Sequence, residues 1–233
     1  DRDRFLADHA GRIRGAATTG ATGLAGALIE RLPRLEVVAS YGVGTDAIDL
    51  AACRRRGVGV SNTPDVLTDE VADFAMALLL ASARRIPQAD ADVRRGDYRR
   101  DGKDQYPLTR RVRGRKVGIV GLGQIGAAIA ARLAPFGPIA YTGTGRKEVP
   151  YPFVPDAVAL AGQSDVLVIA CAANAATRHL IDAKVIAALG PEGYLINVAR
   201  GSVLDEGALI AALETGDLAG AFPLATVMDE LTA

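Results

Sequence analysis

The segment KVGIVGLGQIGAAIAARL, residues 116–133, constrains the fold of this chain more than any other. An apolar run is followed by three glycines spaced as GxGxxG and then by apolar residues at helical spacing. Gly121 allows a tight turn, Gly123 lets a ligand pyrophosphate approach the backbone, and Gly126 lets the helix pack closely on the strand. The amino end of that helix offers free N–H groups and a partial positive charge to the anion. The segment therefore predicts a dinucleotide-binding strand–loop–helix unit.

The rest of the chain alternates short apolar or β-branched runs with Ala/Leu-rich helical patterns. This alternation is typical of βαβ units, and it predicts an α/β fold with a doubly wound, mostly parallel sheet and helices on both faces. Strands are expected at 12–19, 35–42, 57–62, 116–121, 138–143, 165–172 and 193–199. Helices are expected at 47–57, 68–85, 124–137, 182–190 and 205–216.

Composition excludes several classes of function. Of the 233 residues 49% are apolar and 23% charged, and the formal net charge is zero. Bulk attraction to nucleic acid or to an anionic membrane is therefore not indicated, and no apolar run is long enough to span a bilayer. Cys53 and Cys171 lie far apart and suggest neither a disulfide framework nor a metal site. We expect a cytoplasmic protein without metal, nucleic-acid or membrane partners.

Residues 93–116 interrupt the alternation with ten Lys or Arg against three Asp. One interpretation is a solvated connection. The other is a positive rim that attracts a phosphorylated ligand. The sequence assigns this segment no definite role.

The end of the strand after the glycine loop bears on the choice of dinucleotide. NAD-binding folds usually carry Asp or Glu there, which accepts hydrogen bonds from the ribose 2′-hydroxyl. This chain has the small hydroxyl-bearing stretch that begins at Thr142, then Arg146 and Lys147, and no acid before Glu148. Cations suit a 2′-phosphate. We predict NADP(H), with NAD as the alternative; in the competing interpretation Arg146 and Lys147 are ordinary loop charges.

Several motifs in the same order resemble the D-isomer-specific 2-hydroxyacid dehydrogenases, and most of all their glyoxylate/hydroxypyruvate reductase branch. They are VASYGVGTDAIDL, SNTPDVLTDEVADFAMALLL, VGIVGLGQIG, ATRHLID and INVARGSVLDEGALIAAL. The resemblance implies hydride transfer between a nicotinamide and the 2-carbon of a small 2-oxo or 2-hydroxy acid, in a homodimer. It also implies a flavodoxin-like substrate domain over residues 1–66, incomplete here, a Rossmann-type cofactor domain over 67–221 and an uncertain tail over 222–233.

The same resemblance assigns roles to individual residues. Val43 and Gly44 would offer backbone N–H groups to the substrate carboxylate, which a glycine turn can do. Thr68 would face the cofactor, besides its place at a helix start. Arg200 would hold the carboxylate and the 2-oxo oxygen and polarise the carbonyl. The alternative, an ordinary surface arginine, does not explain the apolar strand before it or the turn at Gly201. The predicted cofactor-binding residues are Thr68, Gly121, Gly123, Gln124, Ile125, Gly126, Thr142, Arg146, Lys147, Cys171, Ala172, Thr177, Asn197 and Ala199.

The resemblance weakens after Ala221. The family also uses a glutamate and a later histidine, the general acid that protonates the new alkoxide. In one interpretation FPLATVMDEL is a diverged form of the glutamate segment, and Glu230 is the catalytic glutamate; in the other, Glu230 is a charged residue on a frayed terminus. No histidine follows Arg200. The chain as printed is thus expected to lack an N-terminal strand and the histidine segment, and to bind cofactor with greatly reduced turnover.

Two further hypotheses stay open at this point. The chain could be a non-catalytic dinucleotide-binding relative that acts as a sensor or co-repressor, although the substrate-holding motifs argue against it. It could also be a structural fragment that binds nothing, because the truncated first domain leaves a sheet edge and apolar helix faces uncovered.

Overall fold

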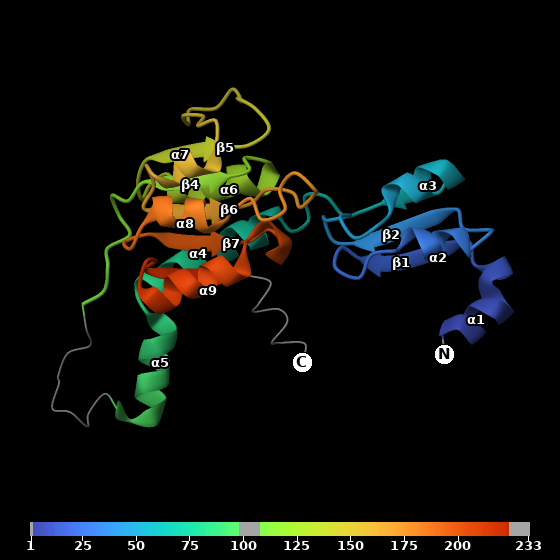
Figure 1. Ribbon diagram of the computed structural model, residues 1–233, viewed down its shortest axis with the longest axis horizontal. Helices are drawn as coiled ribbons and strands as arrows, with labels where there is room; N and C mark the ends of the chain where they lie inside the picture. Colours follow the sequence, from blue (N-terminus) through green and yellow to red (C-terminus); the bar gives the residue numbers. More distant parts are fainter. Residues whose placement is uncertain (1, 98–107, 224–233) are drawn as a thin grey trace. The chain divides into compact units, whose positions relative to one another are not determined.

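The computed structural model describes residues 2–97 and 108–223, which divide into two compact units, Asp1–Leu67 and Thr68–Ala233 (Figure 1). Both units are α/β, and all their paired strands are parallel. No helix in these two described ranges has the length and apolar character needed to cross a membrane.

The first unit is a three-stranded sheet in the order β1-β2-β3. Its elements are α1 (Arg2–His9), η1 (Ala10–Arg12), β1 (Gly15–Thr19), α2 (Gly26–Glu30), β2 (Val37–Tyr41), α3 (Leu50–Arg56) and β3 (Gly59–Ser61). Asp49 caps α3 by accepting a hydrogen bond from Ala52 N at 2.8 Å. A separate core, which includes Ile29, Val38 and Ala52, lies in this unit.

The second unit is a five-stranded sheet in the order β5-β4-β6-β7-β8. Its elements are α4 (Thr68–Ala83), α5 (Ile86–Arg95), β4 (Val117–Val120), α6 (Gln124–Leu133), β5 (Ile139–Thr142), α7 (Ala157–Ala161), β6 (Val166–Ile169), α8 (Ala183–Leu189), β7 (Tyr194–Asn197), η3 (Gly201–Val203), α9 (Glu206–Thr215) and β8 (Gly220–Pro223). The strand order reverses between β4 and β6. Doubly wound sheets bind ligands at such a point, beyond the carboxyl ends of the strands.

Helices cover both faces of this sheet. Val166 and Val168 belong to a core that α4 and α6 close, whereas Leu167 and Ile169 belong to a second core on the side of α7, α8 and α9. Strands buried on both faces read as continuous apolar runs, because neither set of alternating side chains meets water. The predicted doubly wound α/β class is confirmed.

All seven predicted strands and five predicted helices form, within a few residues of the expected bounds. Helices α1, α2, α5 and α7 and strand β8 were not predicted. Helices α2 and α7 have five residues each, too short for a helical period to be recognised in sequence. In α1 and α5 the charged residues dominate the pattern, and most of each helix is exposed.

The basic segment 93–116 is not one continuous connection. Its first three residues end α5, which extends away from the sheet (Figure 1), and its last residues lead into β4. Arg94 and Arg95 pair with Asp90 and Asp92 on α5 itself. Residues 98–107 lie outside the described part of the chain.

Candidate functional site

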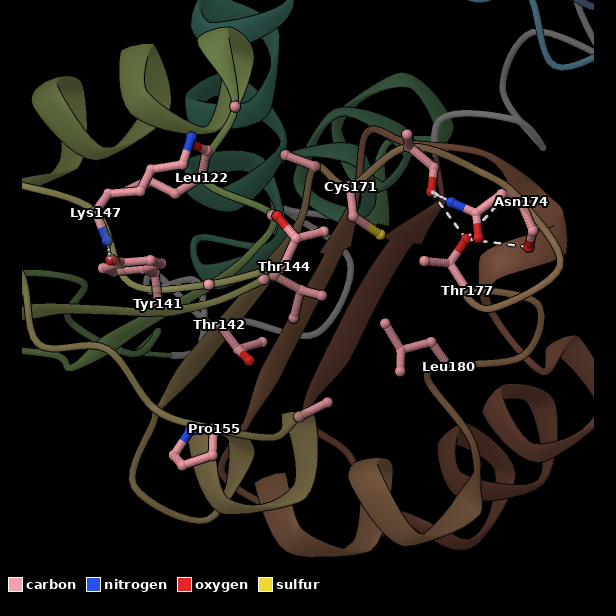
Figure 2. Close-up of a pocket in the computed structure, with 18 residues that line it drawn as sticks. Leu122, Tyr141, Thr142, Thr144, Lys147, Pro155, Cys171, Asn174, Thr177 and Leu180 are labelled. Carbon is pink, nitrogen blue, oxygen red and sulfur yellow. Dashed lines mark hydrogen bonds between the residues drawn. The ribbon is translucent and has the colours of Figure 1, made fainter.

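A pocket of about 410 Å³ lies at the carboxyl ends of β4, β5 and β6 (Figure 2). The glycine loop after β4, the loop after β5 and the loop after β6 each form one wall. The lining residues are Val120, Gly121, Leu122, Gly123, Tyr141, Thr142, Gly143, Thr144, Gly145, Lys147, Pro155, Ala157, Ala170, Cys171, Ala172, Asn174, Thr177 and Leu180. The pocket therefore occupies the place where the strand order reverses.

The three glycines of the loop have different surroundings. Gly121 has a φ of +93°, and a Cβ there would lie 2.5 Å from the Cα of Cys171. A Cβ at Gly126 would lie 2.0 Å from the carbonyl oxygen of Gly121. A Cβ at Gly123 would meet no protein atom within 4 Å. Gly121 and Gly126 are thus required by the protein's own packing, while the space beside Gly123 is open.

Lys147 joins the loop after β5 to the glycine loop. Its Nζ donates a hydrogen bond to the carbonyl oxygen of Leu122 at 2.5 Å, and its backbone N donates to the hydroxyl of Tyr141 at 2.6 Å. Figure 2 shows Lys147, Leu122 and Tyr141 along one side of the pocket. Arg146 is not among the lining residues; its guanidinium carbon lies 5.9 Å from the centre of the Phe153 ring.

The loop after β6 is ordered by side-chain hydrogen bonds. Thr177 Oγ1 donates to the carbonyl oxygen of Ala172 at 2.8 Å and accepts from Asn174 N at 2.8 Å. Cys171, at the start of this loop, faces the pocket (Figure 2). Burial raises the pKa of the Cys171 thiol, so the thiol stays protonated at neutral pH.

Arg200 follows β7 and precedes η3. Buried Asn197 holds the turn between them, because its Nδ2 donates to the carbonyl oxygen of Arg200 at 3.1 Å and its Oδ1 accepts from Ala199 N at 3.0 Å. The Arg200 side chain is half-buried, and its Nη1 donates to the carbonyl oxygen of Ala199 at 3.2 Å. The strand, the buried amide and the arginine therefore form one local unit.

The structure brings together only some of the predicted site residues. Gly121, Gly123, Thr142, Lys147, Cys171, Ala172 and Thr177 line the pocket, whereas Thr68, Gln124, Ile125, Gly126, Arg146, Asn197, Ala199 and Arg200 do not. Thr68 begins α4, and Gln124 and Ile125 form the first turn of α6. Val43 and Gly44 lie in the first unit, where their carbonyls accept from Asn62 Nδ2 at 2.8 Å and Ser40 Oγ at 3.1 Å. Glu230 lies outside the described residues.

Several lining residues were missed from the sequence. Tyr141 and Leu122 sit inside apolar runs and look like core residues, and Pro155 and Ala157, just before and at the start of α7, belong to a stretch with no motif. Among the missed residues, Asn174 carried a signal, because it is a polar residue between two pairs of alanines after a buried strand. Among the described residues no three His, Cys, Asp or Glu side chains are placed to hold a metal ion.

The sequence of residues 76–223 matches the family model "D-isomer specific 2-hydroxyacid dehydrogenase, NAD binding domain". The match covers more than half of the chain. The chain belongs to the D-isomer specific 2-hydroxyacid dehydrogenases. The resemblance that the motifs carried is confirmed, and the glycine loop and the pocket both lie within the matched residues.

Sequence alignments with relatives among the 2-hydroxyacid dehydrogenases cover nearly the whole chain. Hydroxyphenylpyruvate reductase of Plectranthus scutellarioides is 46% identical over 93% of this chain and 69% of its own length. Glyoxylate/hydroxypyruvate reductase A of Arabidopsis thaliana is 44% identical over 95% and 70%. The crystal structure of the NADPH-dependent glyoxylate/hydroxypyruvate reductase of Sinorhizobium meliloti, in complex with NADP and malonate, has a TM-score of 0.84 and 45% identity, covering 90% of this chain and 65% of that one.

Proposed function

We propose that this chain is part of an NADP(H)-dependent reductase of small 2-oxo acids, with NAD(H) as the weaker cofactor. The observation that carries the proposal is the pocket at the carboxyl ends of β4, β5 and β6, bounded by a glycine loop with open space beside Gly123. Membership of the dehydrogenase family supports the reaction, and the Sinorhizobium relative bound to NADP supports the cofactor.

In this proposal the pocket residues would hold the adenosine end of the dinucleotide, and Gly123 and the first N–H groups of α6 would bind its pyrophosphate. Lys147 meets the 2′-phosphate. A bound NADPH would supply the hydride that adds to the 2-carbon of the acid, and a proton taken up from solvent would complete the hydroxyl group. The bound nicotinamide supplies only the hydride; the protein residues bind and orient the two reactants.

Arg200 is the proposed substrate-holding residue. Its guanidinium binds the carboxylate and the 2-oxo oxygen of the substrate and stabilises the negative charge that grows on that oxygen. Asn197 and Ala199 position Arg200, because their hydrogen bonds fix the turn that contains it. Val43 and Gly44 are proposed to offer backbone N–H groups to the carboxylate. We assign no general acid within the described residues.

Glyoxylate and hydroxypyruvate are the proposed substrates, since relatives act on these acids by name. The first unit is proposed as the substrate domain and the second as the cofactor domain. A cytoplasmic homodimer is the proposed state of the protein. None of the relatives above favours the sensor hypothesis; a chain that binds NADPH but no 2-oxo acid analogue would support it.

The cofactor assignment is tested by titrating NADPH and NADH against the wild type, Lys147→Ala and Arg146→Ala. A lost charged hydrogen bond to the 2′-phosphate should weaken NADPH binding about tenfold or more in Lys147→Ala. NADH binding should weaken less, because NADH has no 2′-phosphate and loses only the support that Lys147 gives the glycine loop through Leu122. Arg146→Ala is the matched control and should change less, because Arg146 lies over Phe153 outside the pocket lining. Equal affinity of the wild type for both dinucleotides would contradict the assignment.

The role of Arg200 is tested by oxalate binding to the NADPH-bound chain, a readout that does not depend on turnover. Arg200→Lys keeps the charge but loses the planar fork that matches a carboxylate. We expect oxalate affinity to fall about tenfold and NADPH affinity to stay the same. Arg178→Lys, at an exposed arginine outside the pocket lining, should bind oxalate as the wild type does. Unchanged oxalate binding in Arg200→Lys would remove Arg200 from the site.

A further inference from the structure

A second hollow, of about 420 Å³, lies at the amino ends of β4, β6 and β7. The cofactor pocket lies at the opposite, carboxyl ends of the strands. It is lined by Arg110, Arg111, Arg113, Gly114, Arg115, Asp165 and Glu192. The arginines precede β4, Asp165 precedes β6 and Glu192 precedes β7. This hollow contains the last part of the basic segment, to which the proposed reaction gives no role.

Arg115 and a tight turn fix the frame of the hollow. Arg115 Nε donates to the carbonyl oxygen of Arg111 at 2.9 Å, and its Nη1 donates to that of Glu192 at 3.1 Å. Its guanidinium carbon lies 5.5 Å from the centre of the Tyr194 ring. Arg115 N closes the turn on the carbonyl oxygen of Val112 at 3.1 Å, and Gly114 has the positive φ, +89°, that such turns require at this position.

The charges of the hollow do not balance. Four arginines face two carboxylates. Glu192 is paired with Arg110, and Asp165 accepts a hydrogen bond from Lys116 N at 2.7 Å. Within residues 2–97 and 108–223 no carboxylate pairs with Arg111 or Arg113, and both are exposed. The excess of two positive charges would neutralise a phosphate dianion.

We propose that this hollow is a binding site for a small phosphate-bearing anion, separate from the cofactor pocket. Arg111 and Arg113 bind the phosphate oxygens, because a guanidinium presents its N–H donors in a planar fork that matches them. Arg115 positions the backbone of Arg111 and is a supporting residue. The two hollows share no lining residue, so the proposed site is separate from the pocket of the proposed function.

The test is calorimetric titration of pyrophosphate at constant ionic strength, with NADPH present at saturation so that the glycine loop is occupied. We expect one saturable site. Arg111→Ala/Arg113→Ala should bind pyrophosphate about tenfold more weakly or worse. Arg34→Ala/Arg54→Ala removes two exposed arginines from the first unit and should retain the wild-type affinity, although its net charge changes equally.

Three results would overturn the proposal. They are the absence of saturable pyrophosphate binding to the NADPH-loaded chain, an equal loss of affinity in both double variants, and full affinity in the Arg111/Arg113 double variant. If that variant does not fold, Arg111→Lys/Arg113→Lys keeps both charges and removes both forks. Weaker pyrophosphate binding in the lysine variant supports the site, and unchanged binding rejects it.

Discussion

Gly123 and Gly126 lie three residues apart, yet an added methyl group meets open space at one and the Gly121 carbonyl at the other. Gly126→Ala must displace the backbone of the glycine loop, since a Cβ cannot lie 2.0 Å from a carbonyl oxygen. Gly123→Ala leaves the free protein almost unchanged, with a loss of about 1 kcal/mol at most for the poorer helix cap. Sequence spacing alone treats both positions as parts of one motif.

The two variants should therefore fail in different ways. We expect Gly126→Ala to lower the melting temperature clearly. Gly123→Ala should melt close to the wild type but bind NADPH more weakly, because its methyl group occupies space proposed for the pyrophosphate. Melting curves and NADPH titrations of the two purified variants decide this. Normal NADPH affinity in Gly123→Ala would mean that the pyrophosphate lies elsewhere.

Residues of the candidate site could be predicted from the sequence where a motif has a known chemical role. Gly121, Gly123 and Lys147, which line the pocket, were predicted because a glycine loop after a buried strand, and cations without a nearby acid, have a direct physical meaning. Tyr141 could not be identified in this way, because its hydroxyl meets Lys147 N only after the loop folds back over the strand. Nor could the sequence show that Lys147 lines the pocket while its neighbour Arg146 turns towards Phe153.

At the level of elements, α4 packs on one face of the sheet of the second unit, although it precedes the first strand of that unit in sequence. Its side chains Leu78 and Leu79 are buried in the core that α6 also closes. Arg132 on α6 pairs with Asp69 at 2.9 Å and with Asp73 at 2.5 Å, both on α4. These ion pairs are exposed on the acid side and contribute little. The apolar contact therefore holds α4 in place.

Leu79→Ala measures this contact. A fully buried leucine leaves a cavity when truncated, and we expect the free energy of unfolding to fall by about 2–5 kcal/mol. Leu213→Ala on α9 is the control, because Leu213 is 40% exposed and its loss should cost less. Chemical denaturation of both variants gives the comparison. A loss in Leu79→Ala no larger than that in Leu213→Ala would show that α4 contributes little to this core.

Long elements with a clear period were predictable, and short ones were not. Helix α4 has 16 residues, so its apolar positions repeat often enough to be recognised, whereas α7 has five. Strand β8 was not predicted, because Gly220 and Pro223, at its two ends, are poor strand formers. It forms because Ala221 and Phe222 pair with Leu195 and Ile196 of β7, a tertiary contact that no local pattern encodes.

For the whole molecule, each unit has its own core, and the proposed cofactor pocket lies within the second. A ligand that binds only the folded second unit stabilises that unit by mass action, by about 2.7 kcal/mol at a hundredfold excess over Kd. We expect NADPH to slow hydrogen exchange at the amides of β4 and β6 and to leave those of β1 and β2 largely unchanged. Hydrogen–deuterium exchange with mass spectrometry localises the effect; unaltered β4 and β6 would contradict cofactor binding in this pocket.

The loop between β5 and Val149 has one more consequence. Gly143, Thr144, Arg146, Lys147 and Glu148 are exposed, and none of them belongs to either core of the second unit. Substitutions there leave the packing of the sheet intact. Over evolutionary time, substitutions in this loop can change the preference between NADP(H) and NAD(H) at little cost to folding. A lineage that carries this chain can therefore change which cellular pool of reducing equivalents the protein uses, while the rest of the protein stays the same.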